Sequence, residues 1–460
     1  MDKPVSDALV LFGATGDLAS KMLYPALQAL VQHGHLKVPV IGVARAGWDL
    51  DQLRAHVRDS LKQHGTVDED AFARLSGLLR YVDGDYREPA TFDMLHKTLG
   101  AAQRPLHYMA IPPSMFPVVV EGLGRIGGTQ DARVVAEKPF GRDLASAQSL
   151  NRTLHSVFRE DSIFRIDHYL GKETVLNLSY FRFANSFLEP IWNRNYIKSV
   201  QITMAERFGI GSRGKLYDAI GAIRDVVQNH MLQVVAILAM EPPIGGGSEA
   251  LRDEKVKVFR SIRPLTGHSL VRGQYHGYRD EKDVAPDSQV ETFAAMQLHL
   301  DSWRWEGVPF FIRAGKCLTV TATEVLVELR RPPQKVFSEP LPDRSNYVRF
   351  RLGPDRVAIG LGVRTKRPGV SMVGEDVELY VSDEKCDGMS AYERLIGDAM
   401  HGNIWQFDRE DGVEAAWRIV DPVLNMKTPV HEYAPGTWGP AEADAVTAQY
   451  GGWHIPKTTQ

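Results

Sequence analysis

Cysteine is scarce in this chain: Cys317 and Cys386 are the only two among 460 residues. Two cysteines so far apart give neither a disulfide framework nor the CxxC spacing of metal and redox sites, so we expect plain thiols. Excess charge is also absent, because 54 Lys and Arg oppose 57 Asp and Glu and leave a formal net charge of −3. This balance argues against a nucleic-acid partner or an anionic membrane surface.

Long apolar runs are missing as well. The longest, at residues 231–240, is interrupted by Gln233 and is much shorter than the ~20 residues that cross a bilayer. The run at residues 8–12 is too short for the core of a signal peptide. We therefore expect a cytoplasmic protein with no membrane segment. Its length predicts two or three domains of roughly 150 residues each.

The first third of the chain alternates short apolar runs with segments long enough for helices. Residues 8–12, 38–44, 79–82, 106–111 and 133–136 are the apolar runs, and 49–63 and 143–158 are examples of the helical segments. Parallel neighbouring strands require such crossover connections, so the pattern predicts a doubly wound α/β domain.

The pattern changes after about residue 170. Helical stretches begin near residue 172 and at 219–238, whereas residues 200–205, 292–300, 308–313, 324–329 and 347–352 read as strands. Because many of these strands follow one another without a helix, they predict an α+β domain built on an antiparallel sheet.

A glycine-containing turn joins the first strand to the first helix. Its residues are Gly13, Ala14, Thr15, Gly16, Asp17, Leu18 and Ala19. Backbone N–H groups at such a helix start can bind a pyrophosphate, although glycines also occur there for steric reasons. At the end of the second strand, Arg45 stands where NAD-binding domains usually carry an acidic residue. Arg45 would pair with a 2′-phosphate and favour NADP, unless it is an ordinary surface arginine.

Downstream, His168, Tyr169 and Lys172 form a candidate anion site. If the chain is helical or nearly helical from Tyr169 onward, His168 and Lys172 stand four residues apart and can face one anion together. Two interpretations of these residues are open. They form a phosphate-binding site that the Tyr169 hydroxyl completes, or they are an ordinary helix start.

His230 lies in a long apolar stretch, where a buried structural histidine is common. Removal of a hydroxyl proton during hydride abstraction nevertheless needs a base that works near neutral pH, and a carboxylate-oriented histidine suits that role. In an α-helix Asp225 would lie about 140° away from His230, so Asp167 is the better candidate for the orienting carboxylate.

The run RIDHYLGKE at residues 165–173 resembles the active-site signature of the glucose-6-phosphate dehydrogenase family. Other blocks occur in that family's order: GATGDLA at 13–19, EKPFG at 137–141, RDVVQNH at 224–230, VPFFIRAGK at 308–316 and AYERL at 391–395. The resemblance implies a Rossmann NADP-binding domain over residues 1–170 and an α+β substrate-binding and dimerisation domain over residues 171–460. It also implies oxidation of the C1 hydroxyl of glucose 6-phosphate to the lactone by NADP, at the entry of the pentose phosphate pathway.

The resemblance also implies roles for individual residues. His230 would be the general base and Asp167 the carboxylate that orients it, with no metal required. The sugar phosphate would be held by His168, Tyr169 and Lys172, the sugar hydroxyls by Glu206 and Asp225, and Lys316 would complete the substrate site. Lys138 would lie between the substrate and the nicotinamide, and Gly13, Thr15, Gly16, Asp17, Leu18 and Arg45 would bind the cofactor. A homodimer or homotetramer is expected through the exposed face of the large sheet.

Two cations expected from the resemblance are missing. Met22 stands where the family carries a substrate-facing lysine, and no Lys or Arg occurs between Lys316 and Arg330, so that Thr321 replaces a second basic residue. Lys21, Arg213 or Lys215 could substitute. Three alternatives stay open: an NADP-linked glucose-6-phosphate dehydrogenase, the same mechanism on free glucose or another sugar phosphate, and an inactive regulatory member of the family.

Overall fold

The computed structural model describes residues 5–127, 129–245, 247–334, 336–337, 345–353, 357–369, 371–383 and 389–456. The chain divides into two compact units. The first contains Met1–Lys172, Pro243–Asp253 and Met389–Glu414, and the second contains Glu173–Pro242, Glu254–Gly388 and Ala415–Gln460. The division of the sequence after residue 170 into two functional domains stays a prediction.

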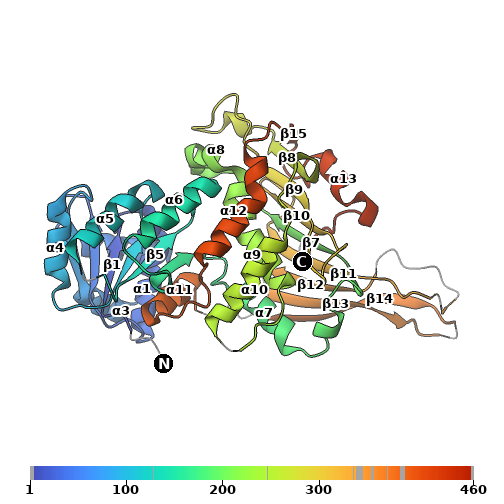
Figure 1. The fold of residues 1–460 in the computed structure, drawn as a ribbon, viewed down its shortest axis with the longest axis horizontal. Helices are drawn as coiled ribbons and strands as arrows, with labels where there is room; N and C mark the ends of the chain where they lie inside the picture. Colours follow the sequence, from blue (N-terminus) through green and yellow to red (C-terminus); the bar gives the residue numbers. More distant parts are fainter. Residues whose placement is uncertain are drawn as a thin grey trace. The chain divides into compact units, whose positions relative to one another are not determined.

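A six-stranded parallel sheet forms the centre of the first unit (Figure 1), in the order β3-β2-β1-β4-β5-β6. The strands are β1 (Ala8–Phe12), β2 (Val40–Ala44), β3 (Leu79–Asp83), β4 (Pro105–Met109), β5 (Arg133–Glu137) and β6 (Ile163–Ile166). In this order β1 lies at the centre, the chain first adds β2 and β3 on one side of it, and it then adds β4, β5 and β6 on the other side. This strand order confirms the doubly wound α/β prediction.

Helices cover both faces of this sheet (Figure 1). On one face lie η1 (Ala19–Leu23, a π-helical turn), α1 (Tyr24–Gln32), α2 (Leu50–His64), α3 (Glu69–Leu78) and α11 (Ala391–His401), and on the other lie α4 (Pro89–Leu99), α5 (Phe116–Ile126) and α6 (Leu144–His155). The start of α2 is fixed by a capping box in which Asp49 accepts from the Gln52 amide and the Gln52 side chain accepts from the Asp49 amide.

The core of the first unit includes a segment from late in the sequence. Leu395, Ile396 and Ala399 of α11 are fully buried in one cluster with Leu9 and Leu11 of β1. The amino-terminal ends of β1 and β5 are tied to the same segment, because the Met400 carbonyl oxygen accepts hydrogen bonds from the Ser6 amide at 2.8 Å and from Arg133 Nη1 at 2.6 Å.

The second unit contains a nine-stranded, mostly antiparallel sheet in the order β14-β13-β12-β11-β7-β10-β9-β8-β15. Its strands are β7 (Ile197–Ala205), β8 (Leu270–Tyr275), β9 (Phe293–Leu298), β10 (Phe310–Gly315), β11 (Ala322–Leu329), β12 (Tyr347–Leu352), β13 (Val357–Lys366), β14 (Gly374–Asp383) and β15 (Val430–Tyr433). Within this second sheet, only the β7–β10 and β8–β15 pairs of described strands are parallel. The α+β prediction is confirmed.

The helices of the second part of the chain are α7 (Glu173–Ala184), α8 (Gly214–Ala222), η6 (Ile223–Met231), α9 (Leu232–Ala239), α10 (Ser248–Ser261), α12 (Glu410–Leu424) and α13 (Asp444–Thr447). Short 3₁₀ turns complete the two units: η2 (Pro113–Met115), η3 (Glu160–Ser162), η4 (Glu189–Ile191), η5 (Gly211–Arg213), η7 (Gly267–Ser269), η8 (Tyr278–Asp280), η9 (Ala441–Ala443) and η10 (Ala448–Tyr450). None of the helices within the described ranges is long and apolar enough to cross a membrane.

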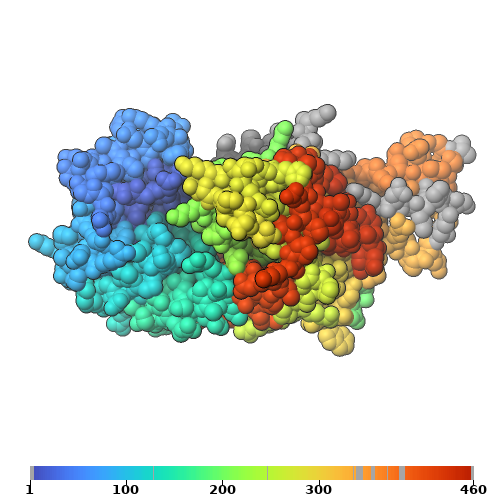
Figure 2. All heavy atoms as spheres, turned by 90° about the horizontal axis from the view of Figure 1, so that it is seen from above, coloured from blue at the N-terminus to red at the C-terminus, as the bar shows by residue number. Residues whose placement is uncertain are grey.

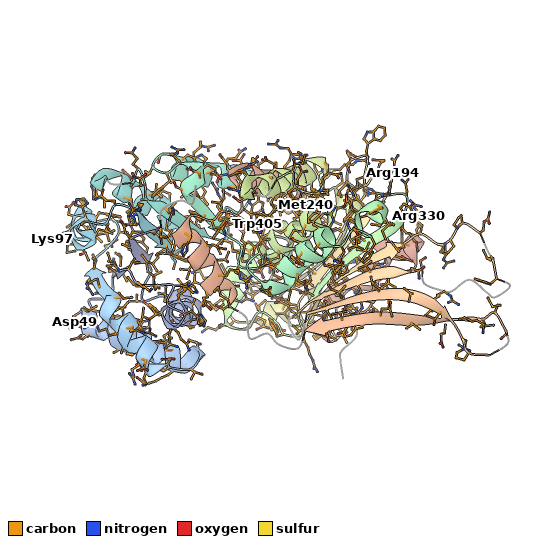
Figure 3. All side chains as sticks on the ribbon, turned by 90° about the horizontal axis from the view of Figure 1, so that it is seen from below. Asp49, Lys97, Arg194, Met240, Arg330 and Trp405 are labelled. Atoms are coloured by element: carbon orange, nitrogen blue, oxygen red, sulfur yellow. The ribbon has the colours of Figure 1, made fainter. Side chains whose placement is uncertain are left out.

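The strands β13 and β14, of ten residues each, follow β12 at one end of the strand order of the second sheet (Figure 1). Arg330, directly after β11, donates from Nε to the Arg194 carbonyl oxygen at 2.9 Å (Figure 3). This bond connects the end of β11 to the segment that precedes β7. Cys317 is a free thiol, as expected, and Cys386 lies outside the described residues.

Candidate active site

The turn after β1 has the backbone that a bound pyrophosphate requires. Gly13 has φ +82°, and a Cβ there would lie 2.2 Å from the Ala110 carbonyl oxygen, so only glycine fits. The Gly13 amide donates to the Val43 carbonyl oxygen at 3.0 Å, and the Gly16 amide donates to the Gly13 carbonyl oxygen at 2.9 Å. The helical turn begins at Asp17, so its positive end points at the space over this turn. These features fit a dinucleotide.

Arg45 lies directly after β2 and is largely exposed. Its Nη1 is 2.7 Å from Asp85 Oδ2, in the segment that follows β3. A hydrogen bond from the Arg87 amide and the Arg45 guanidinium lower the pKa of Asp85. A 2′-phosphate could therefore bind Arg45 only in competition with this carboxylate.

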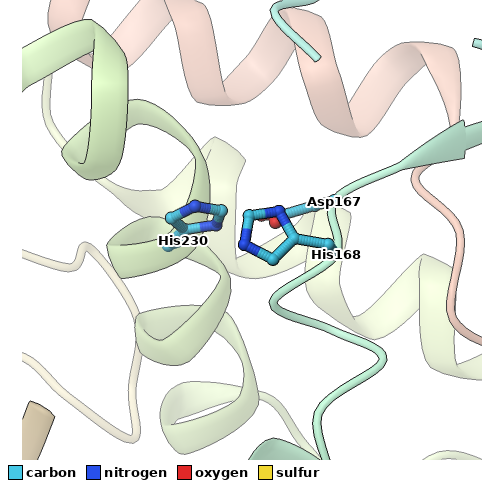
Figure 4. Close-up of side chains that lie close together, drawn as sticks. All are labelled: Asp167, His168 and His230. Carbon is cyan, nitrogen blue, oxygen red and sulfur yellow. The ribbon is translucent and has the colours of Figure 1, made fainter. Parts of the chain in front are cut away.

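The loop that follows β6 carries four predicted site residues. Figure 4 shows Asp167 and His168 on this loop. Asp167 is fully buried, and its Oδ1 accepts a hydrogen bond from the Tyr169 amide at 3.0 Å. The Lys172 ammonium lies 4.7 Å from the centre of the Tyr169 ring. The structure therefore groups Asp167, Tyr169 and Lys172 locally.

The chain of the predicted anion site forms turns rather than an α-helix from Tyr169 onward. Residues 168–172 form tight turns, in which the Leu170 amide donates to the Asp167 carbonyl oxygen and the Lys172 amide donates to that of Tyr169. The helix α7 begins only at Glu173. The four-residue spacing of His168 and Lys172 therefore does not show that their side chains face the same anion. Whether they do depends on the geometry of the turns.

Sequence reasoning missed Glu137, the last residue of β5 and the neighbour of Lys138. Its buried carboxylate accepts a hydrogen bond from the Tyr108 hydroxyl. Burial raises the pKa of Glu137 to about 7, and the Asp167 charge adds to this rise, whereas Tyr108 and Lys138 oppose it. The ring of Tyr392, in α11, stacks on His168 with centroids 6.1 Å apart. The EKPFG and AYERL blocks therefore both reach the Asp167 loop.

We expect Glu137→Gln to stabilise the first unit increasingly as the pH rises. The folded carboxyl has a pKa of about 7 against an ordinary 4.5, so the native state binds the extra proton between these values and wild-type stability falls as the pH rises through them. The glutamine variant has no such carboxyl group, so its free energy of unfolding does not fall with pH in this way. The difference between the two proteins is on the order of 3 kcal/mol. Denaturant unfolding of both proteins at acidic and alkaline pH measures the difference; a pH-independent difference would contradict it.

His230 lies on η6, a π-helix, and is almost fully buried (Figure 4). In a π-helix residue i bonds to residue i+5, so Asp225 and His230 are one turn apart and share a face. A side-chain hydrogen bond of 3.1 Å from Asn229 Nδ2 to the Arg224 carbonyl oxygen also joins two residues that are five positions apart. The sequence-based estimate of about 140° between Asp225 and His230 was therefore wrong, because it assumed an α-helix.

Two predicted substrate residues meet in the second unit. Lys316, directly after β10, forms an ion pair with Glu206, directly after β7. The Lys316 ammonium also lies 5.4 Å from the centre of the Phe208 ring and 5.2 Å from that of Tyr217. Sequence reasoning missed Tyr217, whose pKa is raised far above its ordinary value by burial and by nearby carboxylates that include Asp225 and Glu206. The cluster offers both a cation and carboxylates to a polyhydroxy ligand.

The substitutes for the two missing cations differ in their surroundings. Lys21 Nζ is 2.7 Å from Asp17 Oδ2, so it already pairs with a predicted cofactor residue. Thr321 is used structurally, because its hydroxyl oxygen accepts from the Arg207 amide at 3.0 Å. Met22 is 43% exposed, and Arg213 and Lys215 are exposed on η5 and α8. Lys21 is therefore the least available of the three substitutes.

The first unit also contains a group of possible metal ligands, His155, Glu160 and Glu410. Glu160 is paired with Arg165 at 2.7 Å and with Arg252 at 3.5 Å, and His155 lies 2.8 Å from Glu160. Two guanidinium groups already balance this carboxylate, so we interpret the group as an ion-pair network.

Two family models together match nearly the whole chain. The model described as "Glucose-6-phosphate dehydrogenase, NAD binding domain" matches residues 10–177, and the one described as "Glucose-6-phosphate dehydrogenase, C-terminal domain" matches residues 179–454. The chain belongs to the glucose-6-phosphate dehydrogenase family. It is thus an oxidoreductase that acts on a CH–OH group and has a nicotinamide dinucleotide-binding domain.

Individual members of the glucose-6-phosphate dehydrogenase family agree with this assignment. Glucose-6-phosphate 1-dehydrogenase 1 from Mycobacterium bovis is 43% identical over 98% of this chain and 97% of its own length. The crystal structure of glucose-6-phosphate 1-dehydrogenase from Mycobacterium avium is 44% identical, with a TM-score of 0.93 over 99% of this chain and 100% of that chain. A glucose-6-phosphate dehydrogenase solved in complex with its substrate glucose-6-phosphate is 35% identical, with a TM-score of 0.91 and the same coverage.

Proposed function

We propose that this chain is an NADP-dependent glucose-6-phosphate 1-dehydrogenase, which oxidises the C1 hydroxyl of glucose 6-phosphate to 6-phosphoglucono-1,5-lactone. The observation that carries the proposal is the end-to-end match to both family models. The relative solved with glucose-6-phosphate, which matches 99% of this chain, supports the same substrate. Such an enzyme would start the pentose phosphate pathway. A relative from Solanum tuberosum is named a cytoplasmic isoform, and we propose that compartment here.

In this proposal His230 is the general base. Its neutral imidazole takes the proton from the C1 hydroxyl, and Asp167 supplies the carboxylate that orients the ring and stabilises the resulting imidazolium. A bound nicotinamide dinucleotide supplies the acceptor for the hydride that leaves C1. Asp225 receives a sugar hydroxyl near that base in this proposal, which is supported by its position on the same face of η6 as His230.

Two further sets of side chains hold the substrate and the cofactor. The phosphate binds through His168, Tyr169 and Lys172, the sugar hydroxyls bind Glu206, Asp225 and Lys316, and Lys138 lies between substrate and cofactor. The cofactor binds through Gly13, Thr15, Gly16, Asp17, Leu18, Arg45 and Lys138. The positive φ of Gly13 and the close approach of Ala110 support a pyrophosphate at that turn.

A second candidate is the same reaction on free glucose or another sugar phosphate. The absence of cations at Met22 and Thr321, together with the Lys21–Asp17 ion pair, favours it. An absorbance assay of nicotinamide reduction, comparing glucose 6-phosphate with glucose and NADP with NAD, decides between them. The proposal expects the highest kcat/KM with glucose 6-phosphate and NADP. A higher value with glucose would favour the second candidate.

Arg45→Ala should weaken NADP binding roughly tenfold and leave NAD binding unchanged, because one charge-assisted contact to the 2′-phosphate is lost. Asp85→Asn is the matched variant: it removes the competing carboxylate and should strengthen NADP binding. Fluorescence titrations with the two reduced cofactors measure both effects. An equal loss for NADP and NAD would show that Arg45 does not bind the 2′-phosphate.

We also propose a homodimer or homotetramer that uses the large sheet. Among the described strands β14 is an edge strand, in the part of the chain drawn in orange in Figure 2. Its Leu379 and Val381 are 56% and 72% exposed. A groove of about 790 Å³ lies beside it and is lined by apolar residues such as Phe187, Val336 and Met372. Exposed apolar edges of this kind are typical of subunit contacts. Light scattering should give a multiple of the 51.4 kDa chain mass. A monomer would contradict the proposal.

A further inference from the structure

The first turn of η6 is attached to Glu291, which lies two residues before β9. Glu291 Oε1 accepts a hydrogen bond from the Ile223 amide at 3.2 Å, and the Glu291 carbonyl oxygen accepts one from the Ala222 amide at 2.9 Å. Amides at the start of a helix have no partner within the helix and need one from outside. One residue from another part of the sequence therefore satisfies two successive amides at the start of η6.

Arg272, in β8, holds the Glu291 carboxylate in place. Its Nε and Nη2 donate to Glu291 Oε2 at 3.2 and 3.0 Å, which is a forked contact to a single oxygen. The guanidinium is itself fixed, because Nη2 donates to the Gln289 carbonyl oxygen at 2.6 Å and Nη1 to that of Thr428 at 3.3 Å. The side chains of Arg272 and Glu291 are only 11% and 6% exposed. Removal of either would leave the other charge buried and unpaired.

Gly221 shows how closely this carboxylate approaches the chain. Its φ of +67° and ψ of 178° interrupt the helical path between α8 and η6. A Cβ at Gly221 would lie 2.5 Å from Glu291 Oε1 and 2.9 Å from its Cδ. Any side chain at this position would displace Glu291 as well as strain the backbone.

The start of η6 determines where its functional side chains lie. Asp225 is the third residue of η6 and His230 the eighth, and the i to i+5 bonding of a π-helix puts them on one face. A shift or unwinding at Ile223 would change the register of both. We propose that Glu291, fixed by Arg272, is a positioning residue that sets the direction of the His230 imidazole. This inference rests on the proposed function, in which His230 is the base.

Glu291→Ala tests the inference. We expect kcat with glucose 6-phosphate to fall about tenfold to a hundredfold, because a misplaced base loses its alignment with the reacting proton. The KM for NADP should stay unchanged, since the cofactor residues lie in the first unit. Glu291→Gln keeps an oxygen for the Ile223 amide but loses the ion pair with Arg272, and should restore kcat in part. Glu306→Ala, at an exposed glutamate of the second unit, is the control and should not change kcat.

A double-mutant comparison separates positioning from general destabilisation. In a His230→Asn background, Glu291→Ala should cause no further loss of kcat, because the base that Glu291 positions is already absent. A further loss of the same size as in the wild type would overturn the inference. If Glu291→Ala fails to fold, Gly221→Ala serves instead, because it keeps every side chain of the cluster and displaces Glu291, in addition to straining the backbone at residue 221.

The inference can also be tested without turnover. The imidazole signal of His230 in an NMR spectrum, assigned with His230→Asn, should shift in Glu291→Ala and not in Glu306→Ala. An unmoved signal together with an unchanged kcat would overturn the positioning role. If the wild type does not oxidise glucose 6-phosphate, the proposed function fails by itself, whereas the spectrum still reports whether Glu291 positions His230.

Discussion

His230→Asn should lower kcat by about a hundredfold to ten-thousandfold, the range that general base catalysis contributes. Asparagine fits the space of the buried imidazole and can form hydrogen bonds, but it cannot accept the hydroxyl proton. The affinity for NADP should stay the same, because the candidate cofactor residues belong to the other unit. Steady-state kinetics and a cofactor titration on the same preparation measure both quantities.

The pH profile adds a second test of this assignment. The acid limb of log kcat/KM in the wild type reports the base in the free enzyme, and His230→Asn should lose it. His268→Asn, at an exposed histidine of η7 in the same unit, is the matched control and should keep the wild-type rate and profile. Unchanged turnover in His230→Asn would exclude the residue from the mechanism.

Lys172→Ala should raise the KM for glucose 6-phosphate roughly tenfold to a hundredfold, the equivalent of one charge-assisted contact. The KM for free glucose should change little, because glucose carries no phosphate for the ammonium to bind. The kcat should also change little if Lys172 contacts the ground state and the transition state equally. The ratio of the two KM values therefore isolates the phosphate contact from general damage to the site.

Lys97→Ala, at an exposed lysine of α4 in the same unit (Figure 3), is the control for Lys172→Ala and should leave both KM values unchanged. Equal increases of KM for glucose 6-phosphate and glucose would show that Lys172 supports the site without binding phosphate. That result would favour the second candidate function, since two expected cations are already absent at Met22 and Thr321.

The first sheet could be predicted because its strands are buried on both faces and read as apolar runs. The strand β1 is five buried residues followed by a glycine turn, which is a strong signal of a strand and a following helix. The strand β6 escaped prediction because Arg165 lies in its centre. The sequence shows a charge there, but the structure buries it completely against Glu160 and Asn151.

The outer strands of the second sheet could not be predicted in the same way. The strand β13 contains Gly360 and Gly362, residues that normally disfavour strands. A Cβ at these positions would lie 2.4 Å from Glu378 Oε1 and 2.2 Å from a Tyr347 ring atom, so both glycines make room for neighbouring side chains. Such a need is visible only after the neighbours have been placed.

The candidate site was predictable where a local motif carries it and not where distant segments meet. The RIDHYLGKE run contains Asp167, His168, Tyr169 and Lys172 together, so the resemblance proposes all four as site residues. Tyr217 and Glu291 contact other segments, and no spacing along the chain reveals them, whereas Glu137 stands in the EKPFG block but was given no role there. The π-helix η6 could not be predicted either. The hydrophobic pattern of the sequence does not distinguish i to i+5 backbone hydrogen bonds from the i to i+4 bonds of an α-helix.

The burial of α11 in the core of the first unit has a consequence for biosynthesis. The central parallel sheet is complete once the ribosome has made β6, yet Leu395, Ile396 and Ala399 must still be added to its hydrophobic cluster. Until then the nascent lobe exposes an apolar surface where α11 will bind, so it depends on later translation or on chaperones to stay soluble. An amino-terminal fragment that stops near residue 172 should consequently aggregate, although it contains the whole cofactor fingerprint.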